Sequence, residues 1–335
     1  MRASTTKPRL GITMGDPAGI GPEVIIKALA RPSVCRLFRP LVIGSPEILA
    51  TTSRQLGVPL EFCRVHAQDL SSPVGSIPVL DPSAHPLSDF ALGRVSKETG
   101  EAQVRYVREA VRLAVDGSIA GIVTAPINKE AINLAGYPYP GHTELLAELT
   151  GAKEVGMMIV GGPLRFMFTT THVAMKDLAS SLTIERIEQA IRLCHQGLTR
   201  LFAIKSPRIA VAALNPHAGE GGLFGNEEID VIAPGIDRAR ARGYATHGPF
   251  PADTLIAQAA AGKYDAVVAM YHDQGLIALK LAAFGKSVNI TVGLPIVRTS
   301  VDHGTAYDIA GKGVADEGSL IEAIRLAVRF SPPAP

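Results

Sequence analysis

The sequence contains no tryptophan, only three cysteines and no long apolar run. Cys35, Cys63 and Cys194 lie far apart and form no CxxC pair, which argues against a disulfide framework or a thiolate zinc site and favours a reducing compartment. No run approaches the roughly 18 apolar residues of a membrane span, and the first residues lack the apolar stretch of a signal peptide. We therefore expect a cytoplasmic protein that does not bind a membrane.

Charged residues are scarce as well, at 19% of the 335 residues, and the formal net charge is only +2. Lysine and arginine are scattered along the chain, so the sequence shows neither a basic stripe for nucleic acid nor a polybasic membrane patch. Apolar residues are abundant instead: 47% of the chain is hydrophobic, and 33 residues are glycine. This composition is typical of a Gly-rich α/β protein that is large enough for about two domains.

Short apolar runs alternate with longer amphipathic stretches, which predicts β-α units around a mostly parallel sheet. Strands are expected at 9–15, 39–45, 120–126, 155–161, 164–172, 207–217, 264–272 and 286–293, and helices at 22–30, 102–117, 184–202 and 320–330. Residues 71–90 hold four prolines and are expected to form an irregular surface connection. No long linker divides the chain, so two domains would have to share strands or exchange segments.

Three of the nine histidines, His172, His217 and His272, stand at the carboxyl ends of expected buried strands. Ligands of open α/β sheets bind outside those ends, so neighbouring strands would bring the three imidazoles to one crevice. Three neutral nitrogen donors leave coordination positions open for water and substrate, as in catalytic metal sites. Imidazole favours Zn, Co, Ni or Fe, and Asp273 could orient an imidazole from behind. The alternative is three histidines that each hydrogen-bond locally.

Two glycine-rich turns could bind anions or a nucleotide. In residues 12–24, ITMGDPAGIGPEV, a strand passes through a Gly/Pro loop into a helix whose first turn offers free N–H groups. In residues 300–320, Asp302, His303, Thr305 and Asp308 stand among four glycines, and carboxylates there could reach ribose hydroxyls. A plain strand-to-helix turn and a solvated connection explain the same residues equally well.

Five polar residues are candidate substrate contacts: His142, Thr143, Lys280, Asn289 and Arg298. His142 and Thr143 stand in GHTE, where a helix begins. The other three recur at nine-residue intervals around a strand. Arg298 can bind phosphate or carboxylate through two parallel hydrogen bonds, whereas Lys280 supplies a point charge.

With these residues and the motifs that contain them, the chain resembles the 4-hydroxythreonine-4-phosphate dehydrogenases, which are NAD-dependent enzymes of pyridoxal phosphate synthesis. The resemblance covers residues 9–330 through MGDPAGIGPE, TAPINKEA, YPGHTE, TTH, LNPHAGEGG, FPADT, AMYHDQGL, VNITVGLP and RTSVDHGTAYDIAGKG. It implies two α/β/α domains with a cleft between them, in a fold similar to isocitrate and isopropylmalate dehydrogenases. The expected domains are 1–138 plus 290–335 on the cofactor side, and 139–289 on the metal, substrate and dimer side.

The resemblance also implies roles for single residues. His172, His217 and His272 match the ligands of one divalent metal (Zn, Co or Mg), and the five polar candidates match the substrate contacts. Gly304, Thr305, Asp308 and Gly311, with Asp16 of the first glycine-rich turn, are the candidates for binding NAD or NADP. The family site lies at a homodimer interface and draws on both subunits.

The chemistry implied is oxidation of 4-phosphooxy-L-threonine to a β-keto acid, which loses carbon dioxide to give 3-amino-2-oxopropyl phosphate. A Lewis-acidic cation would lower the pKa of the substrate hydroxyl. A base, either Lys280 or Asp253, would take the proton while hydride leaves for nicotinamide.

Three alternatives remain open. A paralogous dehydrogenase of 4-phosphothreonate or 4-phosphoerythronate would share the metal and phosphate ligands. A phosphate acyltransferase on a similar fold would need neither the histidines nor the DIAGKG loop. A non-catalytic module with a structural metal would normally close the site with a fourth protein ligand.

Overall fold

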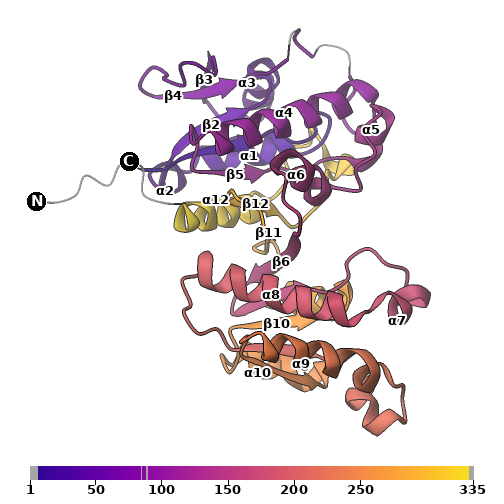
Figure 1. Cartoon of the computed structure of the whole chain (residues 1–335). Helices are drawn as coiled ribbons and strands as arrows, with labels where there is room; N and C mark the ends of the chain where they lie inside the picture. Colours follow the sequence, from indigo (N-terminus) through magenta and orange to yellow (C-terminus); the bar gives the residue numbers. More distant parts are fainter. Residues whose placement is uncertain (1–6, 84, 88–89, 332–335) are drawn as a thin grey trace, which may run out of the picture. The chain divides into compact units, whose positions relative to one another are not determined.

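The computed structural model describes residues 7–83, 85–87 and 90–331, and it divides into two compact units. Unit 1 consists of residues 1–153 and 294–335, and unit 2 of residues 154–293. The chain thus leaves unit 1, builds unit 2 and returns, which is the exchange of segments that the absence of a linker requires. Figure 1 shows α1 and α12, from the first and last parts of the described chain, in the same unit.

Unit 1 contains a sheet of six parallel strands in the order β3-β4-β2-β1-β5-β12. The strands are β1 (Arg9–Thr13), β2 (Arg39–Ile43), β3 (Glu61–Val65), β4 (Ser76–Leu80), β5 (Gly121–Thr124) and β12 (Arg298–Val301). The strands β1, β5 and β12 are almost entirely buried, as expected for a parallel sheet that is covered on both faces. Their carboxyl ends carry the glycine-rich turn after β1 and the loop after β12.

The helices of unit 1 are α1 (Gly21–Leu29), α2 (Pro32–Cys35), α3 (Pro46–Gln55), α4 (Lys97–Val115), α5 (Lys129–Leu134), α6 (His142–Thr150) and α12 (Gly318–Phe330). Three of them, α3, α4 and α5, begin at a side-chain cap, which is Ser45, Ser96 and Asn128 respectively. Ser96 accepts a hydrogen bond from the Thr99 amide, so α4 starts five residues before the expected 102. Pro22 stands in the first turn of α1, as the sequence predicts.

Unit 2 contains a mixed sheet in the order β11-β6-β7-β10-β8-β9. The strands are β6 (Gly156–Gly161), β7 (Leu164–Phe168), β8 (Ile209–Ala212), β9 (Thr246–Phe250), β10 (Ala266–Ala269) and β11 (Val288–Val292). The pairs β11–β6 and β6–β7 are antiparallel, whereas β7–β10, β10–β8 and β8–β9 are parallel. β7, β10 and β8 are therefore neighbours that point the same way.

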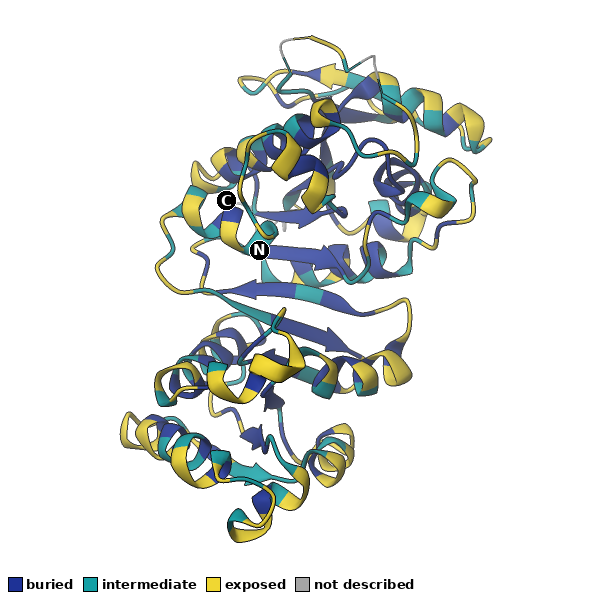
Figure 2. Cartoon of the chain, turned by 90° about the vertical axis from the view of Figure 1, so that its right-hand side faces the viewer, coloured by how far each residue is buried: buried dark blue, intermediate teal, exposed yellow. Residues whose placement is uncertain are grey.

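Helices cover both faces of the unit 2 sheet, because side chains alternate along each strand. The helices are α7 (Leu178–Ser181), α8 (Ile184–Arg200), α9 (Ala233–Ala241), α10 (Ala252–Ala260) and α11 (His272–Ala283). Phe166 and Phe168 join a buried cluster with Leu276 and Leu279 of α11. The α8 helix packs against β6, β7, β10, β11 and β8. Figure 2 shows the result, with buried strands between helices whose outer sides are exposed.

The expected α/β fold class is confirmed, and most expected elements exist with shifted ends. The expectation of an irregular connection at 71–90 is wrong for Ser76–Leu80, which forms β4 with four buried residues. Pro78 is tolerated because it lies opposite Cys63 of β3, while β4 pairs with β2 only from Val79 onward. The strands β3, β9 and β12 were also not expected, since none has a long apolar run.

The first division between the units falls after Lys153, later than the expected 138, and the second lies between Gly293 and Leu294. The difference arises because α6 packs against α4 of unit 1. Among the described residues, no helix combines the length and the apolar character needed to cross a membrane.

Candidate active site

The carboxyl ends of β7, β10 and β8 form one edge of the unit 2 sheet. β10 pairs in parallel with β7 on one side and with β8 on the other. The three histidine-bearing strands are therefore neighbours, as the expected crevice requires. His172 follows β7 by four residues, His217 follows β8 by five, and His272, the first residue of α11, follows β10 by three.

The structure brings two of the three imidazoles together. The ring centroids of His172 and His272 are 5.9 Å apart, with the planes inclined at 39°. His272 Nδ1 lies 2.6 Å from Asp273 Oδ1, so the carboxylate engages that nitrogen and leaves Nε2 for a ligand. Asp273 thus occupies the orienting position that the sequence suggests.

His217 stands on an exposed loop of left-handed backbone. Its Nδ1 lies 3.1 Å from Glu220 Oε2, and its ring contacts Phe224 edge-on. Residues 217–221 all have positive φ angles, from 45° to 79°. The buried Glu228 carboxylate anchors the base of the loop by accepting hydrogen bonds from the amides of Leu214 and Asn215, both at 2.8 Å.

The two neighbouring imidazoles suit a divalent cation of intermediate softness but do not complete its site. In the part of the chain that the structure describes, no group of three or more His, Cys, Asp or Glu side chains could hold a metal ion. The His172 and His272 rings are therefore only two neighbouring imidazoles, and a metal ion held by both would need further ligands. The side chain of His217 is 71% exposed and so remains accessible.

Three further candidate residues belong to unit 2: Lys280, Asp253 and Asn289. Lys280 is exposed on α11, and Asp253 is exposed in the first turn of α10. Asn289 lies on β11, and its Oδ1 is a buried atom with no hydrogen-bond partner among the described residues. A buried amide oxygen without a donor is costly, which makes Asn289 a credible ligand-binding group.

In unit 1, Arg298 opens β12 and is only 2% exposed. Thr124 of β5 accepts hydrogen bonds from the guanidinium, at 3.2 Å from Nε and 2.7 Å from Nη2. The Thr124 hydroxyl in turn donates to Ser300 Oγ at 2.9 Å. Burial lowers the pKa of Arg298 to about 9, so the guanidinium remains charged at neutral pH.

His142 and Thr143 form the first turn of α6, behind the extended Gly141. No side chain caps this helix, so its first N–H groups remain available to an anion. His142 Nε2 is buried without a partner among the described residues. Burial and then the charges of Arg298 and Lys129 hold the pKa of His142 well below its ordinary value, so the ring is neutral beside two cations.

The candidate cofactor-binding residues of the loop after β12 differ in their exposure to solvent. Gly304, Asp308 and Gly311 are exposed, whereas Thr305 is buried. Asp16 is completely buried at the end of β1, where it accepts hydrogen bonds from the Tyr307 hydroxyl and the Ala18 amide. Burial raises the pKa of Asp16, and the Tyr307 hydrogen bond opposes that shift.

Sequence reasoning missed three residues that the geometry makes prominent. Thr124 holds Arg298, Lys129 places a charge near His142, and Tyr307 binds Asp16. Thr124 and Lys129 stand in TAPINKEA and Tyr307 in the loop after β12, so all three could have been considered. Their partners are distant in sequence, and only the fold reveals the pairs.

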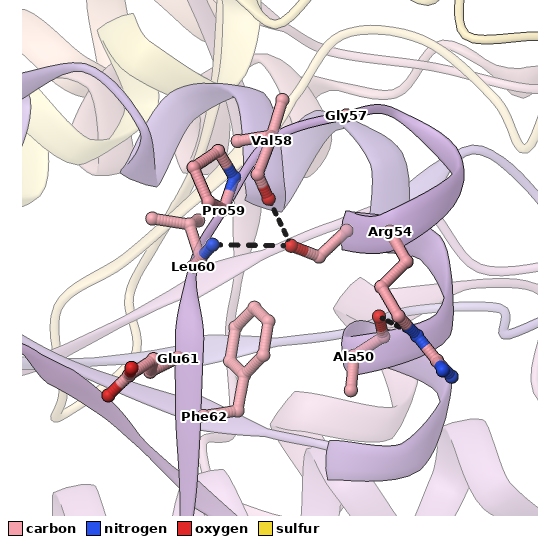
Figure 3. A pocket seen from close by; sticks show the side chains of 9 residues that line it. Ala50, Arg54, Gly57, Val58, Pro59, Leu60, Glu61 and Phe62 are labelled. Carbon is pink, nitrogen blue, oxygen red and sulfur yellow. Dashed lines mark hydrogen bonds between the residues drawn. The ribbon is translucent and has the colours of Figure 1, made fainter.

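A pocket between α3 and β3 lies away from all these residues (Figure 3). Its lining includes Arg54, Leu60, Glu61 and Phe62. Ser53 Oγ holds the turn there by accepting from the Leu60 amide at 3.4 Å and donating to the Val58 carbonyl. These bonds stabilise the turn, and none of the candidate site residues lines the pocket.

Comparison with known proteins agrees with this architecture. The chain is 48% identical over 327 residues to a 4-hydroxythreonine-4-phosphate dehydrogenase of Geobacter metallireducens, covering 97% of this chain and 96% of that one. It is equally 48% identical, over 320 residues, to a D-threonate 4-phosphate dehydrogenase of Cupriavidus necator, covering 95% and 96%. A crystal structure of 4-hydroxythreonine-4-phosphate dehydrogenase from Klebsiella pneumoniae matches with a TM-score of 0.86 and 44% identity, covering 97% and 99%.

By fold and by these relatives, the chain is a dehydrogenase of the α/β class. The family model of the pyridoxal phosphate biosynthetic protein PdxA matches residues 36–327, so the chain belongs to the PdxA family.

Proposed function

We propose that this dehydrogenase oxidises the secondary alcohol of 4-phosphooxy-L-threonine, with NAD or NADP as hydride acceptor. The product is a β-keto acid, which decarboxylates to 3-amino-2-oxopropyl phosphate on the route to pyridoxine 5′-phosphate. Besides the family, the observation that carries the proposal is the His172–His272 pair at the ends of adjacent parallel strands. An open site with imidazole donors is one way to hold a cation that assists the oxidation of an alcohol.

His172 and His272 would hold a divalent cation such as Zn, Co or Mg, with His217 as the third ligand. The cation, when bound, acts as a Lewis acid on the substrate hydroxyl. Asp273 fixes the ring of His272 through the 2.6 Å contact at Nδ1, so that Nε2 faces the ligand.

The anionic ends of the substrate would be bound by charge and by free backbone N–H groups. In unit 1, Arg298, His142, Thr143 and the neighbouring Lys129 form a positive group at the start of α6. In unit 2, Lys280 and Asn289 supply a cation and an amide. Phosphate and carboxylate suit this donor set, because a guanidinium and a helix N-terminus both favour anions.

The loop after β12 would bind the dinucleotide, with exposed Gly304, Asp308 and Gly311 facing it and buried Thr305 shaping the loop. The choice between NAD and NADP stays open. The cofactor supplies the hydride acceptor.

We further propose that the enzyme is a homodimer whose subunits share the active site. Ile277 and Leu281 of α11, with Phe284 just after its last residue, form an exposed apolar stripe, and the three residues are 64%, 85% and 82% exposed. Ile277 and Leu281 are four residues apart and therefore share one face of α11, which also carries Lys280. A second copy that covers this stripe would place Lys280 at the interface. Leu223, at 72% exposed, adds an apolar surface beside the His217 loop.

The first test is the substrate itself. We expect the purified protein to produce NADH or NADPH from 4-phosphooxy-L-threonine in the presence of a divalent cation, as measured by absorbance at the nicotinamide band. The second candidate substrate is D-threonate 4-phosphate, because a relative of that name is 48% identical. The two differ at C2, where an amino group replaces a hydroxyl, so the ratio of the two kcat/KM values identifies the preferred substrate. Turnover of neither would contradict the proposal.

The two candidates for the general base are Lys280 and Asp253, which are both exposed residues of unit 2. We expect the variant that lacks the base to lose one limb of its pH–rate profile, because the rate then no longer depends on deprotonation of that group. Profiles of kcat/KM for Lys280→Met and Asp253→Asn, measured side by side, distinguish the two residues. If both variants kept the full wild-type profile, neither residue would be the base.

A further inference from the structure

The buried Asp16 carboxyl and the Tyr307 hydroxyl join two segments that are 291 residues apart in the chain. Tyr307 donates to Asp16 Oδ2 at 2.5 Å, and the Ala18 amide donates to Asp16 Oδ1 at 2.8 Å. Asp16 has no exposed surface. For its carboxylate to accept a hydrogen bond from a ribose hydroxyl, this arrangement would have to open, so Asp16 is poorly placed as a cofactor contact.

Backbone contacts support the same junction. The Ile20 amide donates to the Thr305 carbonyl at 3.0 Å. A Cβ at Gly19 would lie 2.9 Å from Thr305, so only glycine allows this approach. Ala306 has a φ of 45°, a left-handed conformation that costs an alanine about 1–2 kcal/mol and needs support from its surroundings. Tyr307, which follows it, supplies such support.

A second junction lies at the far end of the same loop. Glu23 of α1 is 2% exposed and accepts hydrogen bonds from the amides of Ala315 at 2.8 Å and Gly313 at 3.2 Å. Lys27 donates to the carbonyls of Ala315 at 2.7 Å and Gly313 at 2.9 Å, and it pairs with Glu23 at 2.8 Å. Side chains of α1 therefore satisfy the backbone groups at this end.

Between the two junctions stand residues 308–312, of which Asp308, Gly311 and Lys312 are exposed. This short segment is held at both ends by the strand-to-helix turn of residues 14–27 and is displayed to solvent. From this geometry we infer that Asp16, Tyr307, Glu23 and Lys27 are positioning residues. They hold the loop after β12 in the shape that binds a nicotinamide dinucleotide, without touching the dinucleotide.

The inference rests on the proposed function. In it, the turn after β1 and the start of α1 hold the loop after β12 in the shape that binds the cofactor. Removing these hydrogen bonds should weaken dinucleotide binding while leaving the proposed substrate-binding residues of α6 and β12 in place. The metal-binding histidines belong to unit 2 and should not respond.

The test uses Tyr307→Phe, which removes one hydroxyl and keeps the ring. We expect the Kd for NADH, measured by fluorescence titration of the full-length protein, to rise about tenfold, as for the loss of one hydrogen bond to a charged group. Hydrogen exchange at residues 302–315, measured without cofactor, should accelerate. In steady state, KM for the dinucleotide should rise while KM for the phosphorylated substrate stays within about twofold, a split that general destabilisation would not produce.

Tyr139→Phe is the matched control, because Tyr139 also donates to a carboxylate, Glu148, at 2.7 Å, and neither residue belongs to the loop after β12 or to the segment that holds it. It should leave both NADH binding and exchange at 302–315 unchanged. Asp16→Asn probes the same bond from the other side. If the bond is what matters, the double variant Asp16→Asn/Tyr307→Phe should bind NADH no more weakly than the weaker single variant.

The outcomes separate the two proposals. If the wild-type protein binds neither NADH nor NADPH, the proposed function fails and this inference fails with it. If the wild type binds and Tyr307→Phe binds equally well with unchanged exchange, only the inference is overturned. A loss of binding in Tyr139→Phe equal to that in Tyr307→Phe would also overturn it.

Discussion

Replacing His272 with alanine is expected to reduce kcat/KM by more than the roughly 10–100-fold that is typical for residues behind a metal ligand. The reason is that His272 offers Nε2 beside His172, and its loss would leave one imidazole of the pair. Bound metal, measured by mass spectrometry after dialysis, should fall together with activity. Chelation of the wild-type enzyme should have the same effect, and added Zn or Co should reverse it.

The control for this experiment is His195→Ala, because His195 lies on α8 and contacts Tyr244 instead of the strand ends. It should retain metal and turnover. Full metal content and full activity in His272→Ala would disprove the metal assignment.

Mixing two inactive variants then tests where the third imidazole originates. If His217 of one subunit completes the His172–His272 pair of the other, then His217→Ala mixed with His272→Ala should recover about a quarter of wild-type activity. Half of the randomly mixed dimers are heterodimers, and each contains one intact site. If all three ligands came from one subunit, no mixed dimer would contain an intact site and no activity would return.

Replacing Arg298 with methionine is expected to lower kcat/KM by about 100-fold or more, equivalent to about 3 kcal/mol, the scale for truncating a buried charge that binds a charged partner. The guanidinium is buried and is oriented by Thr124, so it needs no reorganisation to meet an anion. Inhibition by inorganic phosphate should weaken in parallel, which gives a readout independent of turnover.

Methionine preserves most of the side-chain volume, and the Thr124 hydroxyl keeps its hydrogen bond to Ser300 at 2.9 Å. The variant should therefore remain folded, as measured by thermal unfolding. Arg325→Met, which removes an exposed ion pair with Glu322, is the control and should keep wild-type kinetics. Wild-type kcat/KM in Arg298→Met would show that the guanidinium does not bind substrate.

Strand-end histidines could be predicted because apolar runs end abruptly at them, and the parallel order β7-β10-β8 makes those ends neighbours. The distances between the rings could not be predicted, since they depend on how each chain segment turns after its strand. The left-handed conformation of His217 is the clearest case, because nothing in an isolated histidine indicates a φ of 54°.

Short polar strands cannot be predicted from apolar runs. β12 consists of Arg298, Thr299, Ser300 and Val301, a sequence with only one apolar residue, yet all four are buried. Its polar side chains are satisfied by partners far away, such as Thr124 and the Ala323 carbonyl. Arg298 could be proposed as an anion-binding residue from the sequence, but its place in a buried strand could not be predicted. The Asp16–Tyr307 pair could not be predicted either, because the two residues are 291 positions apart in the sequence.

The left-handed run that carries His217 has a consequence for assembly. Three of its five residues are not glycine, and each stores about 1–2 kcal/mol of backbone energy. The folding of unit 2 must meet that cost through contacts such as those of Glu228, so the loop is stiff before any ion or neighbouring subunit arrives. In the dimer proposed above, little conformational entropy of this loop would then be lost on association.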